Sequence, residues 1–264
     1  MSEFTAFHRG GSGEPLVLIH GFTGTWEMWD PVISPLEEHY DVFIPTLPLH
    51  AGGPSIEGEA SVDLLLEGTE TLLDEAGIET AHIVGNSLGG YAALRLAASG
   101  RARTVNALAP AGGWAEGDPV VDQTMDFFQQ MIPMVAAAAE HVDEAVATPE
   151  GRAMLLQFLT EHPEVVSPEL TRKILLGGAG CTEALALAEM GRTADWSFDY
   201  EAINCPTRIV WGTEDKVLGW PVAAARYQEG LPDADWVILE GIGHCPMLDV
   251  PERTVELITE FARD

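Results

Sequence analysis

One pentapeptide constrains the fold of this chain more than any other stretch: Gly85-Asn86-Ser87-Leu88-Gly89. The pattern alone is weak, but it follows a short apolar run that predicts a strand and precedes an Ala- and Leu-rich stretch that predicts a helix. A serine at such a junction takes a strained backbone conformation that holds its hydroxyl above the sheet edge. We expect a Cβ at Gly85 or Gly89 to collide with the neighbouring strand or helix. We also expect the helix N-terminus to direct unpaired N–H groups toward negative charge beside Ser87.

Composition bounds the class of protein. The chain has 264 residues, of which 46% are hydrophobic and 21% charged, enough for one α/β domain with an insertion. Its formal net charge of −29 argues against nucleic acid or an anionic membrane as a partner. An acid-rich chain whose only lysines are Lys173 and Lys216 reflects either adaptation to salt or compositional bias with a well-hydrated surface, and we favour the second.

Targeting signals and cysteine usage indicate the cellular compartment of the protein. No 18-residue apolar run predicts a membrane span, and Met1–Thr5 shows neither the basic nor the apolar part of a secretory signal. The three cysteines are widely spaced and form no CxxC pair, so neither a disulfide framework nor a zinc site is expected. Reduced thiols in a cytoplasmic protein fit this pattern best.

Strand and helix patterns alternate in the two outer parts of the chain. Strands are expected at 4–8, 16–19, 41–45, 81–85, 104–109, 207–211 and 234–239, and helices at 26–39, 61–76, 88–99, 221–229 and 251–261. This alternation predicts a mostly parallel twisted sheet with helices on both faces. The middle shows only helical periodicity, at 120–131, 134–146, 150–160, 168–176 and 182–191. We therefore expect an α/β core at 1–111 and 205–264 and a helical cap at 112–204.

Two further residues complete a constellation around Ser87. A serine hydroxyl is a poor nucleophile unless a base takes its proton. His244 follows the strand at 234–239, and Asp215 follows the strand at 207–211, so both are expected at the sheet edge that carries Ser87. The order Ser, Asp, His is the one that accompanies such a serine turn, with the carboxylate fixing the tautomer of the imidazole.

Other histidines and acids of the chain are alternatives to this set, and acyl transfer also requires donors for an oxyanion. We expect His20, His50 and His82 to be satisfied structural histidines, and Asp249, five residues past His244, to be a loop-fixing carboxylate ahead of Pro251. Glu214, next to Asp215, is the nearest alternative acid. For an oxyanion that develops beside Ser87, the expected donors are the backbone N–H groups of Phe22 and Leu88, and loss of one such donor typically costs ~10²–10³ in rate.

The His20-Gly21 turn, the Gly85–Gly89 elbow, the Gly212–Asp215 segment and Gly243-His244, in this order, resemble the α/β-hydrolase fold family over essentially the whole chain. The resemblance implies that Ser87, His244 and Asp215 are nucleophile, base and acid, and that the inserted helices take the place of the family's cap. A serine at the elbow argues against the family's dehalogenases and epoxide hydrolases, which use Asp there. Thr46 and Leu49 stand where relatives often carry Asp and Gly, so the substrate of a relative does not transfer directly.

We predict a serine hydrolase that cleaves a small-to-medium apolar carboxylic ester through an acyl-enzyme, without cofactor or metal. The residues expected to form its substrate pocket are Trp26, Trp114, Phe127, Phe128, Met131 and Phe158. Asn86 and Arg172 also resemble carbon–carbon bond hydrolases of ring-fission products, and lactonase or perhydrolase chemistry fits the same residues. A non-catalytic small-molecule receptor is the alternative from another class, and a homodimer is compatible with the sequence.

Overall fold

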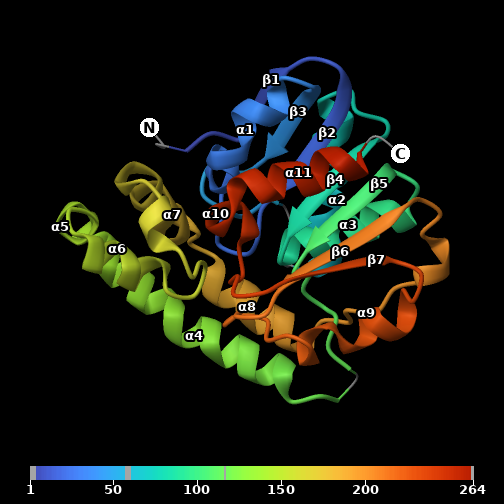
Figure 1. The fold of residues 1–264 in the computed structure, drawn as a ribbon. Helices are drawn as coiled ribbons and strands as arrows, with labels where there is room; N and C mark the ends of the chain where they lie inside the picture. The colour runs from blue at the N-terminus through green and yellow to red at the C-terminus, as the bar shows by residue number, and fades with distance from the viewer. Residues whose placement is uncertain (1–3, 57–60, 116, 263–264) are drawn as a thin grey trace.

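The computed structural model describes residues 4–56, 61–115 and 117–262, so residues 1–3, part of the stretch expected to lack a secretory signal, lie outside it. Within the described residues one sheet is formed by β1 (Phe7–Gly11), β2 (Glu14–Ile19), β3 (Tyr40–Pro45), β4 (Ala81–Asn86), β5 (Ala102–Leu108), β6 (Thr207–Gly212) and β7 (Asp235–Leu239). The strand order is β1-β3-β2-β4-β5-β6-β7. Only the β1–β3 pair is antiparallel, so the predicted mostly parallel sheet is confirmed (Figure 1).

Helices cover both faces of this sheet because alternate strand residues point to opposite sides. On one face Val17 and Ile19 belong to one hydrophobic cluster with residues of α2 (Val62–Glu75), α3 (Leu88–Ala98) and α9 (Ala225–Gly230). On the other face, Leu16 and Leu18 pack with α1 (Asp30–Glu37) and α11 (Pro251–Phe261). A strand buried on both faces reads as a continuous apolar run, which is why these strands could be predicted.

The middle of the chain is helical, as predicted. The helices between β5 and β6 are α4 (Val120–Ala139), α5 (Val142–Val146), α6 (Pro149–Leu156), α7 (Pro168–Gly180) and α8 (Ala184–Thr193), and they lie together on one side of the sheet (Figure 1). The expected break near residue 133 is wrong, because α4 continues through Pro133. Pro133 removes one backbone donor from the helix, but it lies on an exposed face where water can solvate the freed carbonyl.

The first strand also differs from its prediction. It runs over Phe7–Gly11 rather than residues 4–8. Gly10 and Gly11 pair with Val42 and Asp41 of β3, so the ladder continues beyond the predicted end of the strand into a glycine run. Pairing with a neighbouring strand outweighs the local turn preference of glycine here.

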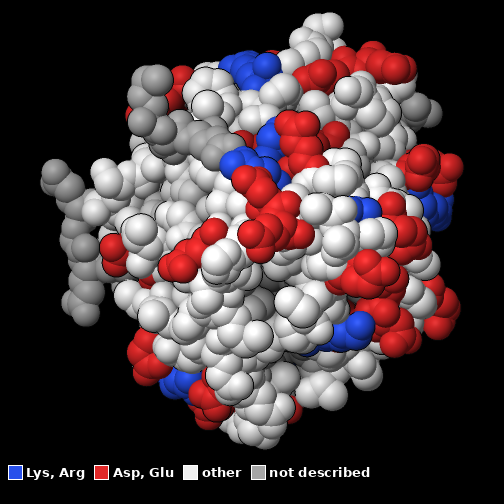
Figure 2. Space-filling model, turned by 90° about the vertical axis from the view of Figure 1, so that its left-hand side faces the viewer, with Lys and Arg blue, Asp and Glu red and all other residues white. Residues whose placement is uncertain are grey.

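The surface carries the acidic bias of the composition. Figure 2 shows Asp and Glu side chains over much of one face with few basic side chains among them. Both lysines are paired, Lys173 with Asp30 at 3.5 Å and Lys216 with Glu161 at 2.5 Å. None of the described helices alone is long and apolar enough to cross a membrane. Helices α7 and α8, which meet at 71°, have the required length and apolar composition only when they are taken together.

Candidate active site

Ser87 lies between the last residue of β4 and the first residue of α3, with φ 57° and ψ −118°. This is the strained turn that the pentapeptide predicts. A Cβ at Gly85 would lie 2.0 Å from the Gly89 oxygen, and one at Gly89 would lie 2.2 Å from the Ile19 oxygen. The expected collisions at both glycines are therefore confirmed, and they explain why strand, turn and helix pack this closely.

Asp215 and His244 form a buried pair. The His244 Nδ1–H donates to Asp215 Oδ2 over 2.7 Å, and their side chains are 4% and 0% exposed, respectively. The other carboxylate oxygen, Oδ1, accepts the backbone N–H groups of Val217 at 2.8 Å and Leu218 at 2.7 Å. With both oxygens engaged, the carboxylate is held in one orientation, and it fixes the tautomer that leaves His244 Nε2 free to accept a proton.

The loop that carries His244 is fixed by Asp249, as predicted. Asp249 Oδ2 accepts the Gly243 N–H at 2.7 Å. Its Oδ1 accepts the His162 N–H at 2.8 Å and the hydroxyl of Thr160. Since Thr160 and His162 follow α6, this buried carboxylate joins the histidine loop to the inserted helices.

Asn86 makes a second connection, which the sequence reasoning missed. Its Nδ2 donates to the His244 oxygen at 3.0 Å and to the Leu108 oxygen at 3.2 Å, and its Oδ1 accepts from the Cys245 thiol at 3.4 Å. The signal in the sequence was a polar side chain at the end of a fully buried strand, because such a group must find hydrogen-bond partners.

Burial raises the pKa of the Cys245 thiol well above its usual value, which agrees with an inert cysteine.

The two expected oxyanion donors lie beside Ser87. Leu88 is the first residue of α3, and Phe22 follows the end of β2. A Cβ at Gly21, next to Phe22, would lie 3.0 Å from the Ser87 Cβ, so this loop packs directly on the elbow. Within the described part of the chain, neither the Phe22 nor the Leu88 backbone N–H has a hydrogen-bond acceptor. Both are therefore available to a ligand.

The rival histidines are neutral or structural. Burial lowers the pKa of His20 to about 3 and that of His50 to about 4. His20 is satisfied by the Gly21 oxygen at 2.7 Å and the Leu47 N–H at 2.9 Å. His82 contacts Thr104 at 2.9 Å and a Glu14 oxygen at 3.2 Å. His50 is satisfied only at Nδ1, and its Nε2 is buried without a partner among the described residues.

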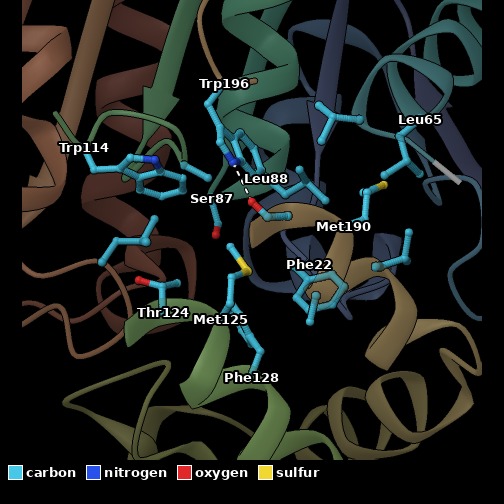
Figure 3. Close-up of a pocket in the computed structure, with 16 residues that line it drawn as sticks. Phe22, Leu65, Ser87, Leu88, Trp114, Thr124, Met125, Phe128, Met190 and Trp196 are labelled. Carbon is cyan, nitrogen blue, oxygen red and sulfur yellow. Dashed lines mark hydrogen bonds between the residues drawn. The ribbon is translucent and has the colours of Figure 1, made fainter. Parts of the chain in front are cut away.

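Two cavities meet at Ser87. The first cavity, about 520 Å³ with its open mouth included, lies between α2, α4 and α8 and includes Leu88, Trp114, Met125, Leu187, Met190 and Trp196 (Figure 3). The second cavity, about 390 Å³ on the same measure, includes Thr23, Phe127, Met131, Phe158, Val217 and His244. Three residues line both cavities: Phe22, Ser87 and Phe128. Ser87 thus stands at the junction of two mostly apolar chambers.

The structure divides the predicted pocket residues between these cavities. Trp114 lines the first, Phe127, Met131 and Phe158 line the second, and Phe128 lines both. Trp26 lines neither: its ring stacks on His8 at a centroid distance of 5.0 Å. Sequence reasoning missed the α8 side of the first cavity, because helical periodicity does not tell which helices face each other.

No group of three or more His, Cys, Asp or Glu within the described ranges is placed to hold a metal ion, and all three cysteines are free thiols.

Comparison with known proteins gives the family. A profile of the alpha/beta hydrolase family matches residues 16–257, so the chain belongs to that family. It is 33% identical over 202 residues to the epoxide hydrolase EphH of Mycobacterium tuberculosis, covering 76% of this chain and 94% of that protein. It is 28% identical to the uncharacterized protein Rv2715 of the same species, covering 97% and 77%.

Solved structures share the fold. A putative lipase (lip1) from Acinetobacter baumannii superposes with a TM-score of 0.76 at 25% identity, covering 97% of this chain and 86% of the other. A bromoperoxidase from Bacillus anthracis superposes with a TM-score of 0.78 at 20% identity, covering 98% and 95%. The predicted family and its general class, a hydrolase, agree with these findings.

Proposed function

We propose that this protein is a serine hydrolase that cleaves uncharged carboxylic esters. The observation that carries the proposal is the buried Asp215–His244 pair, whose histidine lines the same cavity as the strained Ser87. A carboxylate-oriented imidazole that shares a cavity with a serine hydroxyl is the arrangement that activates serine for acyl transfer. The unpaired N–H groups of Phe22 and Leu88 supply what the tetrahedral intermediate requires.

The proposed reaction runs in two halves. Ser87 Oγ forms a bond to the ester carbonyl carbon while its proton passes to His244 Nε2, and the carbonyl oxygen becomes an oxyanion that accepts from Phe22 and Leu88. The carbon–oxygen bond to the alcohol then breaks, and His244 returns the proton to the leaving oxygen. Water, deprotonated by His244, attacks the acyl-enzyme, and the acid leaves as the proton returns to Ser87.

The similarity to EphH raises epoxide hydrolysis as an alternative, and the chemistry of the elbow residue weighs against it. Ring opening of an epoxide by a carboxylate gives an ester, whose carbonyl water can attack. Opening by the Ser87 hydroxyl would give an ether, which has no carbonyl and would not be released. Since this chain has serine at the elbow, ester cleavage uses the residue and epoxide cleavage does not.

Carbon–carbon cleavage of ring-fission products has less support. Arg172 is one of the two residues on which the resemblance to these hydrolases rests. Arg172 pairs with Asp143 at 3.1 Å and lines neither cavity. A lactone is a cyclic ester and would follow the same steps as the proposed reaction.

The proposal is tested with p-nitrophenyl esters from acetate to decanoate, assayed with wild type and Ser87→Ala. We expect turnover by wild type and loss of at least about 10³-fold in kcat for the variant. Styrene oxide and a ring-fission dienone are assayed in parallel. Turnover of either by an enzyme that is inactive on all esters would refute the proposal, and tight ester binding without turnover would indicate a receptor.

A further inference from the structure

We infer that the first cavity receives the acyl chain and the second cavity the leaving alcohol, so that the substrate carries an apolar group on both sides of its ester bond. This assignment rests on the proposed function and adds the substrate class and the orientation. It places Phe127, Met131 and Phe158, three of the residues expected to form the substrate pocket, on the alcohol side of the ester bond.

The division of residues between the cavities gives the orientation. His244 lines only the second cavity, whereas Leu88, one of the proposed oxyanion donors, lines only the first. Phe22 and Ser87 line both, so the carbonyl group belongs at their junction. From that point the two substituents of the carbonyl carbon must extend into different chambers.

Proton transfer decides which substituent goes where. In the first half of the reaction, His244 Nε2 must reach the oxygen of the leaving alcohol, which requires hydrogen-bond distance. The alcohol oxygen and the group attached to it therefore lie on the side that His244 borders, which is the second cavity. The acyl chain is left with the first cavity, whose described lining includes no titratable side chain.

The first cavity also restricts the acyl group by polarity. Apart from Ser87, Thr124 is the one hydroxyl side chain among its described lining residues, and the Trp196 Nε1–H is already bonded to the Gly191 oxygen at 2.8 Å. A charged group placed there would lose its hydration without finding a side chain of opposite charge among the described lining residues. We therefore expect uncharged alkyl or aryl acyl groups and exclusion of acids with a second carboxylate.

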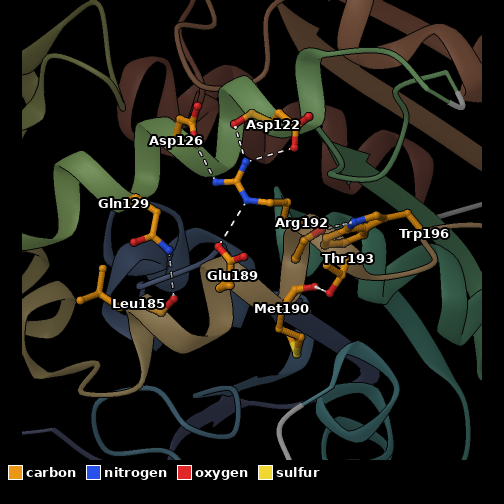
Figure 4. Close-up of polar contacts among 10 residues, drawn as sticks. Asp122, Asp126, Gln129, Leu185, Glu189, Met190, Arg192, Thr193 and Trp196 are labelled. Carbon is orange, nitrogen blue, oxygen red and sulfur yellow. Dashed lines mark hydrogen bonds and ion pairs between the residues drawn. The ribbon is translucent and has the colours of Figure 1, made fainter.

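Contacts between α4 and α8 preform this cavity. Arg192 on α8 pairs with Asp122 at 3.1 Å and Asp126 at 2.7 Å, both on α4, and Gln129 Nε2 donates to the Leu185 oxygen at 3.4 Å (Figure 4). The same two helices supply Met125 and Met190 to the cavity wall. Their spacing is thus held by polar contacts on the outer side of the wall, and side-chain size decides how much acyl chain fits.

Two methionines provide a matched test. Met190 on α8 lines only the first cavity and Met131 on α4 only the second, and both are half-buried. We would measure kcat/KM for p-nitrophenyl acetate and decanoate, which differ in the acyl chain, and for ethyl and decyl acetate, which differ in the alcohol. The variants are Met190→Trp, Met131→Trp and the corresponding alanine variants, each checked by thermal unfolding.

We expect Met190→Trp to lower the decanoate-to-acetate ratio by about tenfold or more and to leave the decyl-to-ethyl ratio unchanged, and Met131→Trp to do the reverse. The alanine variants should shift the same ratios upward, which keeps the test valid if a tryptophan variant is unfolded. Reversed effects, or equal effects of both methionines on both ratios, would overturn the assignment. A wild type inactive on all four esters would instead refute the proposed function.

Discussion

Replacing Asp215 by asparagine separates the catalytic role that we propose for this carboxylate from its structural role. In the native site one oxygen accepts two backbone N–H groups, from Val217 and Leu218, and the other accepts the His244 Nδ1–H. An asparagine keeps an oxygen for the two backbone donors, so its amide NH₂ must face His244. The imidazole then accepts at Nδ1 and carries its proton on Nε2, where it can no longer take the proton of Ser87.

We therefore expect Asp215→Asn to lower kcat by about 10³–10⁴-fold while the free energy of unfolding changes little. Asp215→Ala is the matched comparison, because it leaves both backbone donors unpaired. Each unsatisfied buried donor costs about 1–3 kcal/mol, so this variant should lose activity and stability together. The assay is p-nitrophenyl butyrate hydrolysis with urea unfolding of each protein. Asp215→Asn activity within tenfold of wild type, or a stability loss equal to that of Asp215→Ala, would refute the reasoning.

Three further predictions concern a glycine, a buried carboxylate and a buried histidine. Gly89→Ala should lose about 1–3 kcal/mol of stability in urea unfolding, because its Cβ would lie 2.2 Å from a carbonyl oxygen of β2. Gly219→Ala is the control and should be nearly neutral, because the nearest atom to its Cβ would lie 3.9 Å away. Asp249→Asn should destabilise the protein by about 1–3 kcal/mol and lower kcat, since its amide NH₂ would face a donor; unchanged stability would contradict the hydrogen bonds described for it. The pKa of His50 in the folded protein is about 4, below its ordinary value, so the unfolded chain binds a proton more readily at this residue. The stability that His50 contributes is therefore complete above about pH 6.5 and is lost as pH falls toward 4, at on the order of 1 kcal/mol per pH unit. Unfolding from pH 7 to 4.5 should therefore show a shallower decline for His50→Asn than for wild type, with His39→Asn, at an exposed position, as the control.

The positions of Ser87, Asp215 and His244 could be predicted because each follows a strand. In a parallel sheet the carboxyl ends of neighbouring strands share one edge, so order along the chain gives proximity in space. The collisions at Gly85 and Gly89 follow from the same local geometry. These features depend on short-range sequence and on one general property of sheets.

Other features depend on contacts that no local pattern encodes. Periodicity gives each inserted helix an apolar face but not its neighbour, so the pairing of α4 with α8, and with it Met190 and Trp196, could not be predicted. Pro133 removes one helical hydrogen bond and crowds the carbonyl four residues earlier, and whether packing carries the helix past it is not encoded locally. Asn86 and Asp249 connect loops far apart in the sequence, and their partners become visible only in the folded chain.

Ser87 is the residue that we propose as the nucleophile that carries the acyl group. The most direct test of this role is labelling with a fluorophosphonate, which forms a stable tetrahedral adduct with an activated serine, followed by peptide mass spectrometry and residual ester hydrolysis. We predict one adduct per chain, on the peptide that contains Ser87, with activity lost in proportion to labelling. Ester turnover that persists in a protein fully labelled at Ser87, or an adduct on a different side chain, would contradict the account.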